Sequence, residues 1–340
     1  MQENIETTNL IDEYVQDVIT RNDSMLAYRN VLLEKYKRLP LDEVKSQLKK
    51  VMEEDRVYRG FGDDERNSAN DFELFEKQLP VTIVQLHFGD KQEVKNIMQC
   101  YMDEKNYVQS SNTLSDNAKK LKMNIIEIRL NDSLRDVYKN NLSEIKEKGY
   151  EKDYCSWVLS GKEAEFENRR IVQQEFNANK SNDEIMVFDE ELDKGCCTKS
   201  LTVSLYKLQE KYGLDIFGKL DDVEDVAHPK AITQKLNKYM KSSETGNVED
   251  IKMKRGDIVF LTSSDGSPRH AMLCYDFDKD TNEPLLLGFS SIQNKVKSYK
   301  NGKGESRTGV VLDVNTLIRD AQQSKEKTNH VQQHFVSRDR

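Results

Sequence analysis

Cysteine is scarce in this sequence of 340 residues, and the five cysteines follow no regular spacing. They stand at positions 100, 155, 196, 197 and 274, an odd number without any pair of Cys-x-x-Cys elements. This pattern argues against the disulfide framework of small secreted domains and against common zinc-binding spacings. We therefore expect free thiols in a reducing compartment, with no metal and no other cofactor.

Long apolar runs and basic blocks are also missing. A run such as VTIV at 81–84 is too short to cross a bilayer, so no membrane span is expected. The net charge is −8 and no long basic block occurs, which argues against nucleic acid as a partner. The first twenty residues lack the basic and continuous apolar parts of a secretory signal. We expect a cytoplasmic protein, or one secreted without a conventional signal peptide.

What the sequence does contain is a helical pattern in its first part. The length predicts two domains, or one domain with a large extension. Apolar residues at helical spacing predict three helices within residues 1–80, at 10–19, 25–39 and 41–52.

Residues 81–188 are expected to form an α/β accessory domain. The runs VTIVQLHF, NIIEIRL and EIMVF predict three strands, and the charged stretches between them predict helices. The strands are expected at 81–88, 124–130 and 184–188, and the helices at 91–105 and 131–180.

Residues 189–320 have a different pattern, in which helices precede a group of strands. Two helices are expected, at 197–212 and 229–241, and residues from 321 to 340 form a polar, frayed tail. Turn-forming residues separate four apolar runs that predict strands, at 256–262, 270–277, 284–290 and 309–314.

The stretch KGCCTKSLTVSLYKLQEKYGL (194–214) places two cysteines at the start of a helix. Cys197 begins an apolar stripe that continues through Leu201, Leu205, Leu208 and Tyr212, and Gly213 ends the helix. A helix N-terminus favours a thiolate, because its free N–H groups carry partial positive charge. Cys197 is therefore the predicted nucleophile, and Cys196, rotated by about 100° around the helix, is the alternative.

A base for this thiol is available at the start of a predicted strand. His270 opens HAMLCYDF, and a hairpin would bring the end of PLLLGFS opposite it. Ser290 is therefore the predicted third catalytic residue, with Ser291 and Asn294 as alternatives. The remaining cysteines and histidines are expected to be structural or to lie in turns and the tail: Cys100, Cys155, Cys274, His87, His228, His330 and His334.

A cysteine-led helix, a GDIVF strand, a strand that opens with histidine and a strand that ends in a polar residue resemble the papain-like cysteine hydrolase superfamily. The pair RGDIVFL…HAMLCY is similar to NlpC-type peptidases, and the helix is similar to that of YopT-like effector proteases. The resemblance covers about 189–315. It implies an α+β, papain-like fold, with a nucleophile-bearing helix packed on an antiparallel sheet, beside the N-terminal helical and α/β accessory region.

The resemblance implies a cysteine peptidase or amidase that cleaves a peptide, isopeptide or amide bond. Its substrate would be a protein or peptide, including a host or target-cell protein if the chain is a delivered bacterial effector or toxin. Glu191 stands where papain carries a glutamine in its oxyanion hole, and the third residue is not a carboxylate or carboxamide. These departures leave a catalytically inactive papain-like binding module as an alternative.

A further alternative is an ADP-ribosyltransferase-like N-terminal region. VYRGFG (57–62), YVQSSNTLS (107–115) and DEIMVF (183–188) loosely resemble the elements of that family. Under this reading Arg59, Ser110 or Ser111, and Glu184 would form the site.

Overall fold

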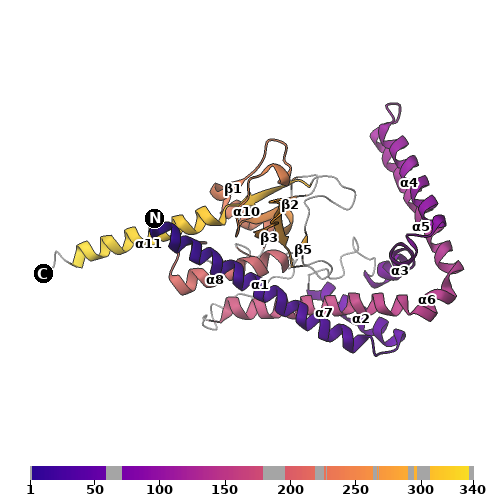
Figure 1. The fold of residues 1–340 in the computed structure, drawn as a ribbon, viewed down its shortest axis with the longest axis horizontal. Coiled ribbons are helices and arrows are strands. Elements are labelled where there is room, and N and C mark those ends of the chain that lie inside the picture. The colour runs from indigo at the N-terminus through magenta and orange to yellow at the C-terminus, as the bar shows by residue number, and fades with distance from the viewer. Residues whose placement is uncertain are drawn as a thin grey trace. The chain divides into compact units, whose positions relative to one another are not determined.

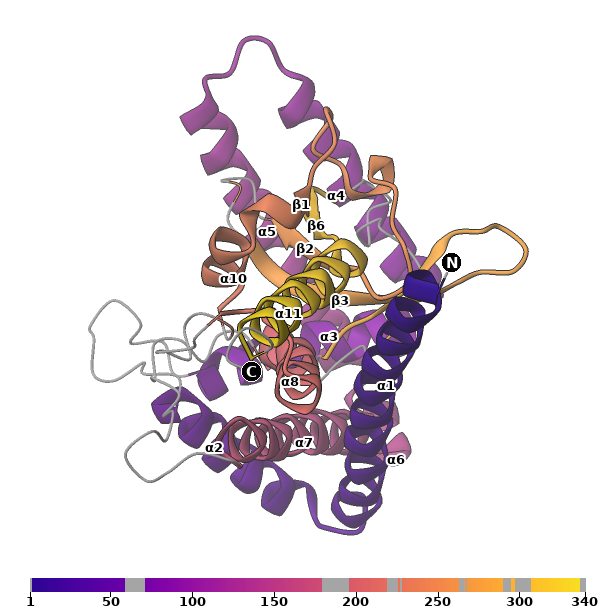
Figure 2. The same ribbon diagram turned by 90° about the vertical axis from the view of Figure 1, so that its left-hand side faces the viewer.

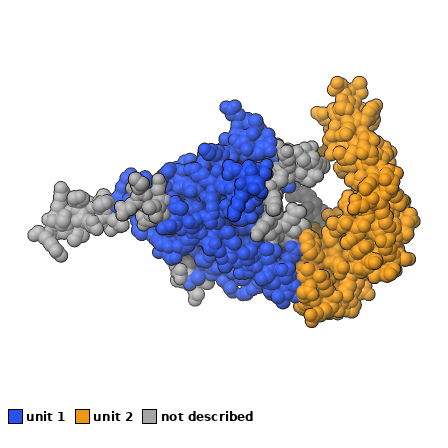
Figure 3. All heavy atoms as spheres, in the orientation of Figure 1, with its two compact units in different colours: residues 1–32, 57–62, 161–340 blue, residues 33–56, 63–160 orange. Residues whose placement is uncertain are grey.

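The structure is a computed structural model that describes most of the chain. The described residues are 2–58, 71–178, 196–218, 226, 228–262, 266, 268–289, 295–296 and 307–336. They form two compact units, coloured separately in Figure 3. The first comprises residues 1–32, 57–62 and 161–340, and the second comprises 33–56 and 63–160. The boundaries of these units differ from the predicted domain boundaries after residues 80 and 188.

The N-terminal residues form one long helix where two were predicted. Helix α1 spans Gln2–Tyr36 without interruption, and α2 spans Leu41–Tyr58 after a bend at Pro40. The polar stretch 20–24 does not end α1, because it contains neither proline nor glycine and the buried apolar stripe resumes at Met25. The prediction of a break near residue 20 was therefore wrong.

The described part of the second unit is helical, as Figures 1 and 2 show. The predicted helices at 91–105 and in the charged region after 131 are confirmed. The elements that lie wholly or partly in this unit are α2, α3 (Asp71–Phe88), α4 (Gln92–Ser110), α5 (Asp116–Asn140), α6 (Leu142–Lys148) and the first part of α7 (Tyr150–Asn177).

The predicted strands at 81–88 and 124–130 are wrong, because both segments are helical. Residues 81–88 end α3, and 124–130 lie within α5. In α3 the buried positions Leu79, Ile83, Val84 and Phe88 follow helical spacing. A short apolar run fits a strand or a buried helix equally well, and only the longer period separates them. The predicted strand at 184–188 lies outside the described residues.

The first unit contains a six-stranded antiparallel sheet in the order β1-β6-β2-β3-β4-β5. The four predicted strands are confirmed: three are shorter than predicted, and the strand that carries His270 begins two residues earlier, at Pro268. Two strands of two residues each join them at the edges. The strands are β1 (Met240–Lys241), β2 (Ile258–Thr262), β3 (Pro268–Phe277), β4 (Pro284–Leu287), β5 (Lys295–Val296) and β6 (Gly309–Leu312). Helices and a small antiparallel sheet make the fold α+β.

Helices border this sheet on either side in the sequence. Helix α8 (Cys196–Tyr212) and the short α10 (Pro229–Lys235) both pack on β3. The predicted helix 229–241 is shorter than expected, since a single 3-10 turn at Asn237–Tyr239 and then β1 follow it. His228, predicted to be a turn residue, caps α10 by accepting a hydrogen bond from the N–H of Lys230 at 3.1 Å.

The polar C-terminal segment is helical and not frayed through residue 336. Helix α11 spans Val314–Val336. Asp313 caps it by accepting a hydrogen bond from the N–H of Thr316 at 3.0 Å, and Leu317 and Ile318 are buried in its first turns. The cap and these apolar contacts start a helix that the polar composition of the tail did not predict.

Among the described residues, none of the helices combines the length and the apolar character that crossing a bilayer requires.

Candidate functional site

Helix α8 positions the predicted nucleophile. It begins at Cys196, and its stripe of Cys197, Leu201, Leu205 and Leu208 is buried as predicted. Gly213, with φ of +56°, follows its last residue, where a left-handed conformation ends the helix. The thiol of Cys197 therefore lies in the first turn of a helix that packs on the sheet.

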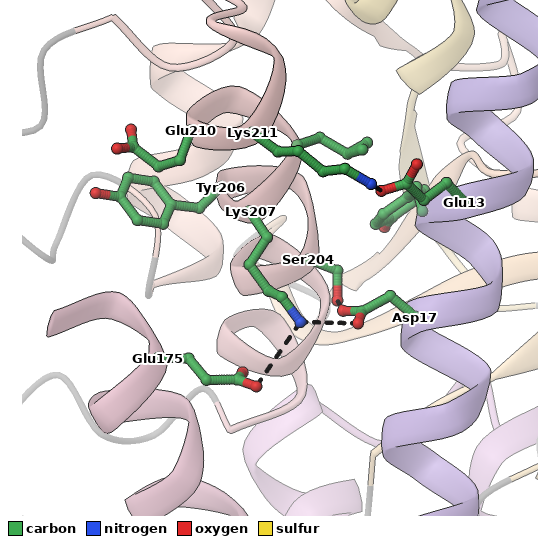
Figure 4. A pocket seen from close by; sticks show the side chains of 10 residues that line it. Glu13, Asp17, Glu175, Ser204, Tyr206, Lys207, Glu210 and Lys211 are labelled. Atoms are coloured by element: carbon green, nitrogen blue, oxygen red, sulfur yellow. Dashed lines mark hydrogen bonds and ion pairs between the residues drawn. The ribbon is translucent and has the colours of Figure 1, made fainter. Parts of the chain in front are cut away.

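Charged contacts with α1 hold α8 in place within the first unit (Figure 4). Asp17 accepts a hydrogen bond from the Ser204 hydroxyl at 2.6 Å and pairs with the Lys207 ammonium at 2.8 Å. One turn away, Lys211 pairs with Glu13 at 2.7 Å. These contacts are made by α8 residues after its first two turns. None of them involves the first turn, which carries Cys197.

Strand β3 brings His270 to the same place. It pairs with β2 in a register that sets His270 opposite Leu261 and Ala271 opposite Phe260. The backbone N–H of Ala271 donates a hydrogen bond to the sulfur of Cys197 at 3.4 Å. The side chains of Cys197 and His270 lie close enough for each to shift the pKa of the other. The structure thus brings together the predicted nucleophile and the predicted base, which are 73 positions apart in the sequence.

The electrostatics of this pair favour a thiolate beside an imidazolium. Burial by itself would raise the pKa of Cys197, but the interaction with His270 and its positive charge, together with the hydrogen bond from the Ala271 N–H, lowers it below the ordinary thiol value. Burial likewise opposes protonation of His270, yet the interaction with Cys197 and its negative charge raises the histidine pKa. Each partner therefore stabilises the charged form of the other.

Gly288 leaves the space that the imidazole occupies. A Cβ at this position, just after β4, would lie 2.9 Å from Nε2 of His270 and 3.2 Å from Cγ of Met272. Sequence reasoning did not single out Gly288 or the Ala271 N–H. A glycine within the strand-like run PLLLGFS was the available signal, because such a glycine often marks a close approach.

The Gly-Asp pair before β2, which contributed to the family resemblance, has a structural role. Gly256 adopts φ of +93°, and a Cβ there would lie 2.9 Å from Cγ2 of Ile11 in α1. The buried Asp257 accepts hydrogen bonds from the Lys254 N–H at 2.9 Å and from Nδ2 of Asn315 at 3.2 Å. Burial raises the pKa of Asp257 to about 6. The pair fixes the start of β2 against α1 and α11.

The other thiols lack an activating environment. Burial raises the pKa of Cys274 to about 12 and that of Cys155 to about 12. Cys274 is part of the apolar core beside Met272, while Cys100 is exposed on α4. The burial of Cys155 and Cys274 is in keeping with the prediction that they are structural, whereas the exposed Cys100 is not buried as a structural cysteine would be.

Several predicted site residues lie outside the description. The side chain of Cys196 and the residues Ser290, Ser291 and Asn294 are not described, nor is Glu191. The described residues therefore identify a pair and leave the third member of the site as a prediction.

The ADP-ribosyltransferase alternative gains no support from its described members. Arg59 and Glu184 lie outside the described residues. Ser110 ends α4 and donates to the carbonyl of Tyr107 at 3.3 Å, while the Ser111 hydroxyl lies 3.1 Å from that of Thr113. Ser110 is exposed, Ser111 is partly buried, and both make local turn contacts.

His87, expected to be structural, stacks on Tyr150 with ring centroids 3.8 Å apart. Within the described part of the chain, histidine, cysteine and acidic side chains form no cluster that could hold a metal ion.

Comparisons with known proteins found no relative. No protein-family model matches the sequence, and no curated protein and no solved structure matches it either.

Proposed function

We propose that this protein is a cysteine hydrolase, a peptidase or amidase that uses Cys197 as nucleophile and His270 as general base and acid. One observation carries the proposal: the Cys197 sulfur lies in the first turn of α8, accepts a hydrogen bond from the Ala271 N–H at 3.4 Å, and lies close enough to His270 for each side chain to shift the pKa of the other. A thiolate–imidazolium pair at a helix N-terminus is the arrangement that makes a thiol nucleophilic near neutral pH.

In the first half of the reaction, the Cys197 thiolate attacks the carbonyl carbon of a peptide, isopeptide or amide bond. The carbonyl oxygen becomes an oxyanion, and the N–H of Cys197 is available to hold it, since the first N–H groups of a helix have no partner within the helix. The imidazolium of His270 gives its proton to the leaving nitrogen as the C–N bond breaks. The products are a free amine and a thioester on Cys197.

In the second half, neutral His270 takes a proton from a water molecule that attacks the thioester. The carbon–sulfur bond breaks, a carboxylic acid leaves, and the proton held by His270 restores the imidazolium beside the thiolate. The two halves together consume one water and need no cofactor. Ser290 is the proposed orienter of His270, with Ser291 and Asn294 as alternatives.

The proposed fold is papain-like. Three features support this: a cysteine-led helix packs on an antiparallel sheet, the strand after the Gly-Asp strand carries the histidine, and the cysteine precedes the histidine in the chain. This order and arrangement resemble NlpC-type and YopT-like peptidases. A protein or peptide is the proposed substrate, met inside the cell or as an effector or toxin delivered to a target cell.

The proposal is tested by labelling with a thiol-directed probe that mimics an amide substrate. We expect Cys197→Ala to abolish labelling of the full-length protein at about pH 6, where ordinary thiols are protonated. The matched control is Cys274→Ala, which removes a buried thiol whose pKa is raised to about 12 and should leave labelling unchanged. Equal labelling of both variants would reject Cys197 as the nucleophile.

A catalytically inactive binding module on the same scaffold is the second candidate. The observation in its favour is the low exposure of Cys197, of which only 7% is accessible. Reactive thiols are usually more accessible. The two candidates differ in turnover: a hydrolase releases amine from a peptide library in a reaction that Cys197→Ala abolishes, whereas a binding module retains peptides without cleaving them.

A further inference from the structure

Helices α4 and α5 form an antiparallel hairpin in the second unit (Figure 2). Ser115 caps α5 by accepting a hydrogen bond from the N–H of Ala118, and Lys119 donates to the carbonyl of Gln109 at 3.1 Å. Farther along, Arg129 of α5 pairs with Glu104 of α4 at 2.7 Å. These contacts fix the register of the two helices.

One face of this hairpin carries an exposed apolar ridge. Leu121, Ile125 and Ile128 of α5 are spaced by four and three residues, so they lie in line on one side of the helix. They are 63%, 47% and 59% exposed, and Tyr107 of α4 beside them is 73% exposed. Single exposed apolar residues are ordinary, but an aligned group of four marks an interaction surface.

A groove runs beside the ridge, between the two helices. It encloses about 530 Å³, and Val108 and Ile126 line it as buried residues. Its acidic side chains come from α4, namely Asp103 and Glu104, and its basic ones come from α5, namely Lys122 and Arg129. Ile125 belongs to both the ridge and the groove.

We infer that this face binds a second copy of the chain, so that two hairpins pack as an antiparallel four-helix bundle. A two-fold interface requires that one surface be complementary to itself. Here the same face carries a ridge and a groove of matching apolar character, together with an acidic edge and a basic edge. Rotation by a two-fold axis sets the Ile125 ridge of each copy into the groove of the other. The same rotation brings Lys122 of each copy to Asp103 of the other.

The charges favour a copy over the other occupants of an apolar face. Glu104 and Arg129 are paired with each other within one copy, so Asp103 and Lys122 decide the charge of the two edges. An anionic membrane would attract Lys122 on the α5 edge but repel Asp103 on the α4 edge. A peptide of one charge sign would likewise meet repulsion on one side. Only a partner that carries a basic edge and an acidic edge, in the opposite order across its face, matches both edges of this hairpin. A second hairpin, turned by the two-fold axis, has that order. This surface does not involve the proposed hydrolase site, and the inference does not depend on that function.

Sedimentation velocity of the full chain, from about 1 to about 100 µM, tests the inference. We expect a concentration-dependent dimer. Ile125→Glu should shift the population to monomer. The control Leu86→Glu, at an exposed apolar residue of α3 outside this face, should leave the dimer intact. Circular dichroism of each variant reports whether the helices persist. A wild type that stays monomeric throughout, or a control that dissociates equally, overturns the inference.

A charge exchange provides an independent reading. Lys122→Glu should weaken the dimer at least tenfold, since it sets two acidic edges against each other. Adding Asp103→Lys in the same chain restores opposite charges across the two-fold axis and should recover most of the loss. A double variant as weak as Lys122→Glu alone would refute the two-fold arrangement.

Discussion

Substitution of Gly288 by alanine is a sharp probe of the Cys197–His270 pair, because it changes no charge and no catalytic group. The added Cβ would lie 2.9 Å from Nε2 of His270, whereas ordinary van der Waals contact begins near 3.4 Å. An imidazole shift of about 0.5 Å restores ordinary contact, and Cγ of Met272, at 3.2 Å from the same Cβ, is crowded as well. Misplacement by 1 Å costs about 100-fold in rate, so a shift of half that size should cost about tenfold.

The effect should depend on pH in a defined way. His270 lowers the pKa of Cys197 and burial raises it, so a displaced imidazole lets that pKa rise. Alkylation by iodoacetamide follows the thiolate, and we expect the Gly288→Ala rate to fall about tenfold near pH 6. Near pH 10 an ordinary thiol is also ionised, so the two proteins should then differ by no more than about twofold.

The control for general destabilisation is Leu286→Val, two residues before Gly288 and within β4. Leu286 is buried in the core cluster beside Cys274, and loss of one methylene should cost about 1 kcal/mol of unfolding free energy. Its alkylation profile should match the wild type. An unchanged rate for Gly288→Ala near pH 6, or an equal loss at both pH values, would refute the reasoning.

Two further predictions concern stability. The folded-state pKa of Asp257 is about 6 against an ordinary 3.8, so the folded protein binds the extra proton and its unfolding free energy falls by about 3 kcal/mol as pH rises from about 4 to about 7.5. Asp257→Asn cannot titrate, so this loss is absent from the variant. Urea unfolding should show the unfolding free energy of the variant, relative to that of wild type, rising by about 3 kcal/mol over this pH range. A difference between the two proteins that stays constant with pH would contradict the assignment. Asp17→Asn weakens the contacts of α1 with Ser204 and Lys207, and we expect a loss of about 1–2 kcal/mol with an unchanged Cys197 alkylation profile. The control Glu13→Gln, at a more exposed pair, should cost less than about 1 kcal/mol, so equal losses would argue against Asp17 as the main anchor of α8.

The sequence by itself determined the elements that carry Cys197 and His270 in the first unit. The stripe from Cys197 through Leu208 repeats at helical spacing, and the four strand-like runs after residue 255 are separated by turn residues, so each element follows from nearby residues alone. The order cysteine, then histidine, also came from the sequence. These features were enough to name Cys197 and His270 before their positions in space were known.

Local patterns failed where the apolar run was short. VTIVQLHF and NIIEIRL look like strands, yet α3 and α5 continue through them, because packing on neighbouring helices outweighs the strand preference of valine and isoleucine. The polar tail forms α11 for a similar reason, since Asp313 caps the helix and apolar residues of its first turns are buried in the first unit. In these segments the contacts that decide the structure come from distant residues.

Only the tertiary structure decided the geometry on which the chemistry depends. No spacing in the sequence could show that the Ala271 N–H reaches the Cys197 sulfur, or that a missing side chain at Gly288 makes room for the imidazole. Both facts arise where α8, β3 and β4 meet, and that meeting depends on the β2–β3–β4 register and on the packing of α8. The sequence decides which groups can react. The fold sets the distances between them to within a fraction of an ångström, because those distances result from many non-local contacts.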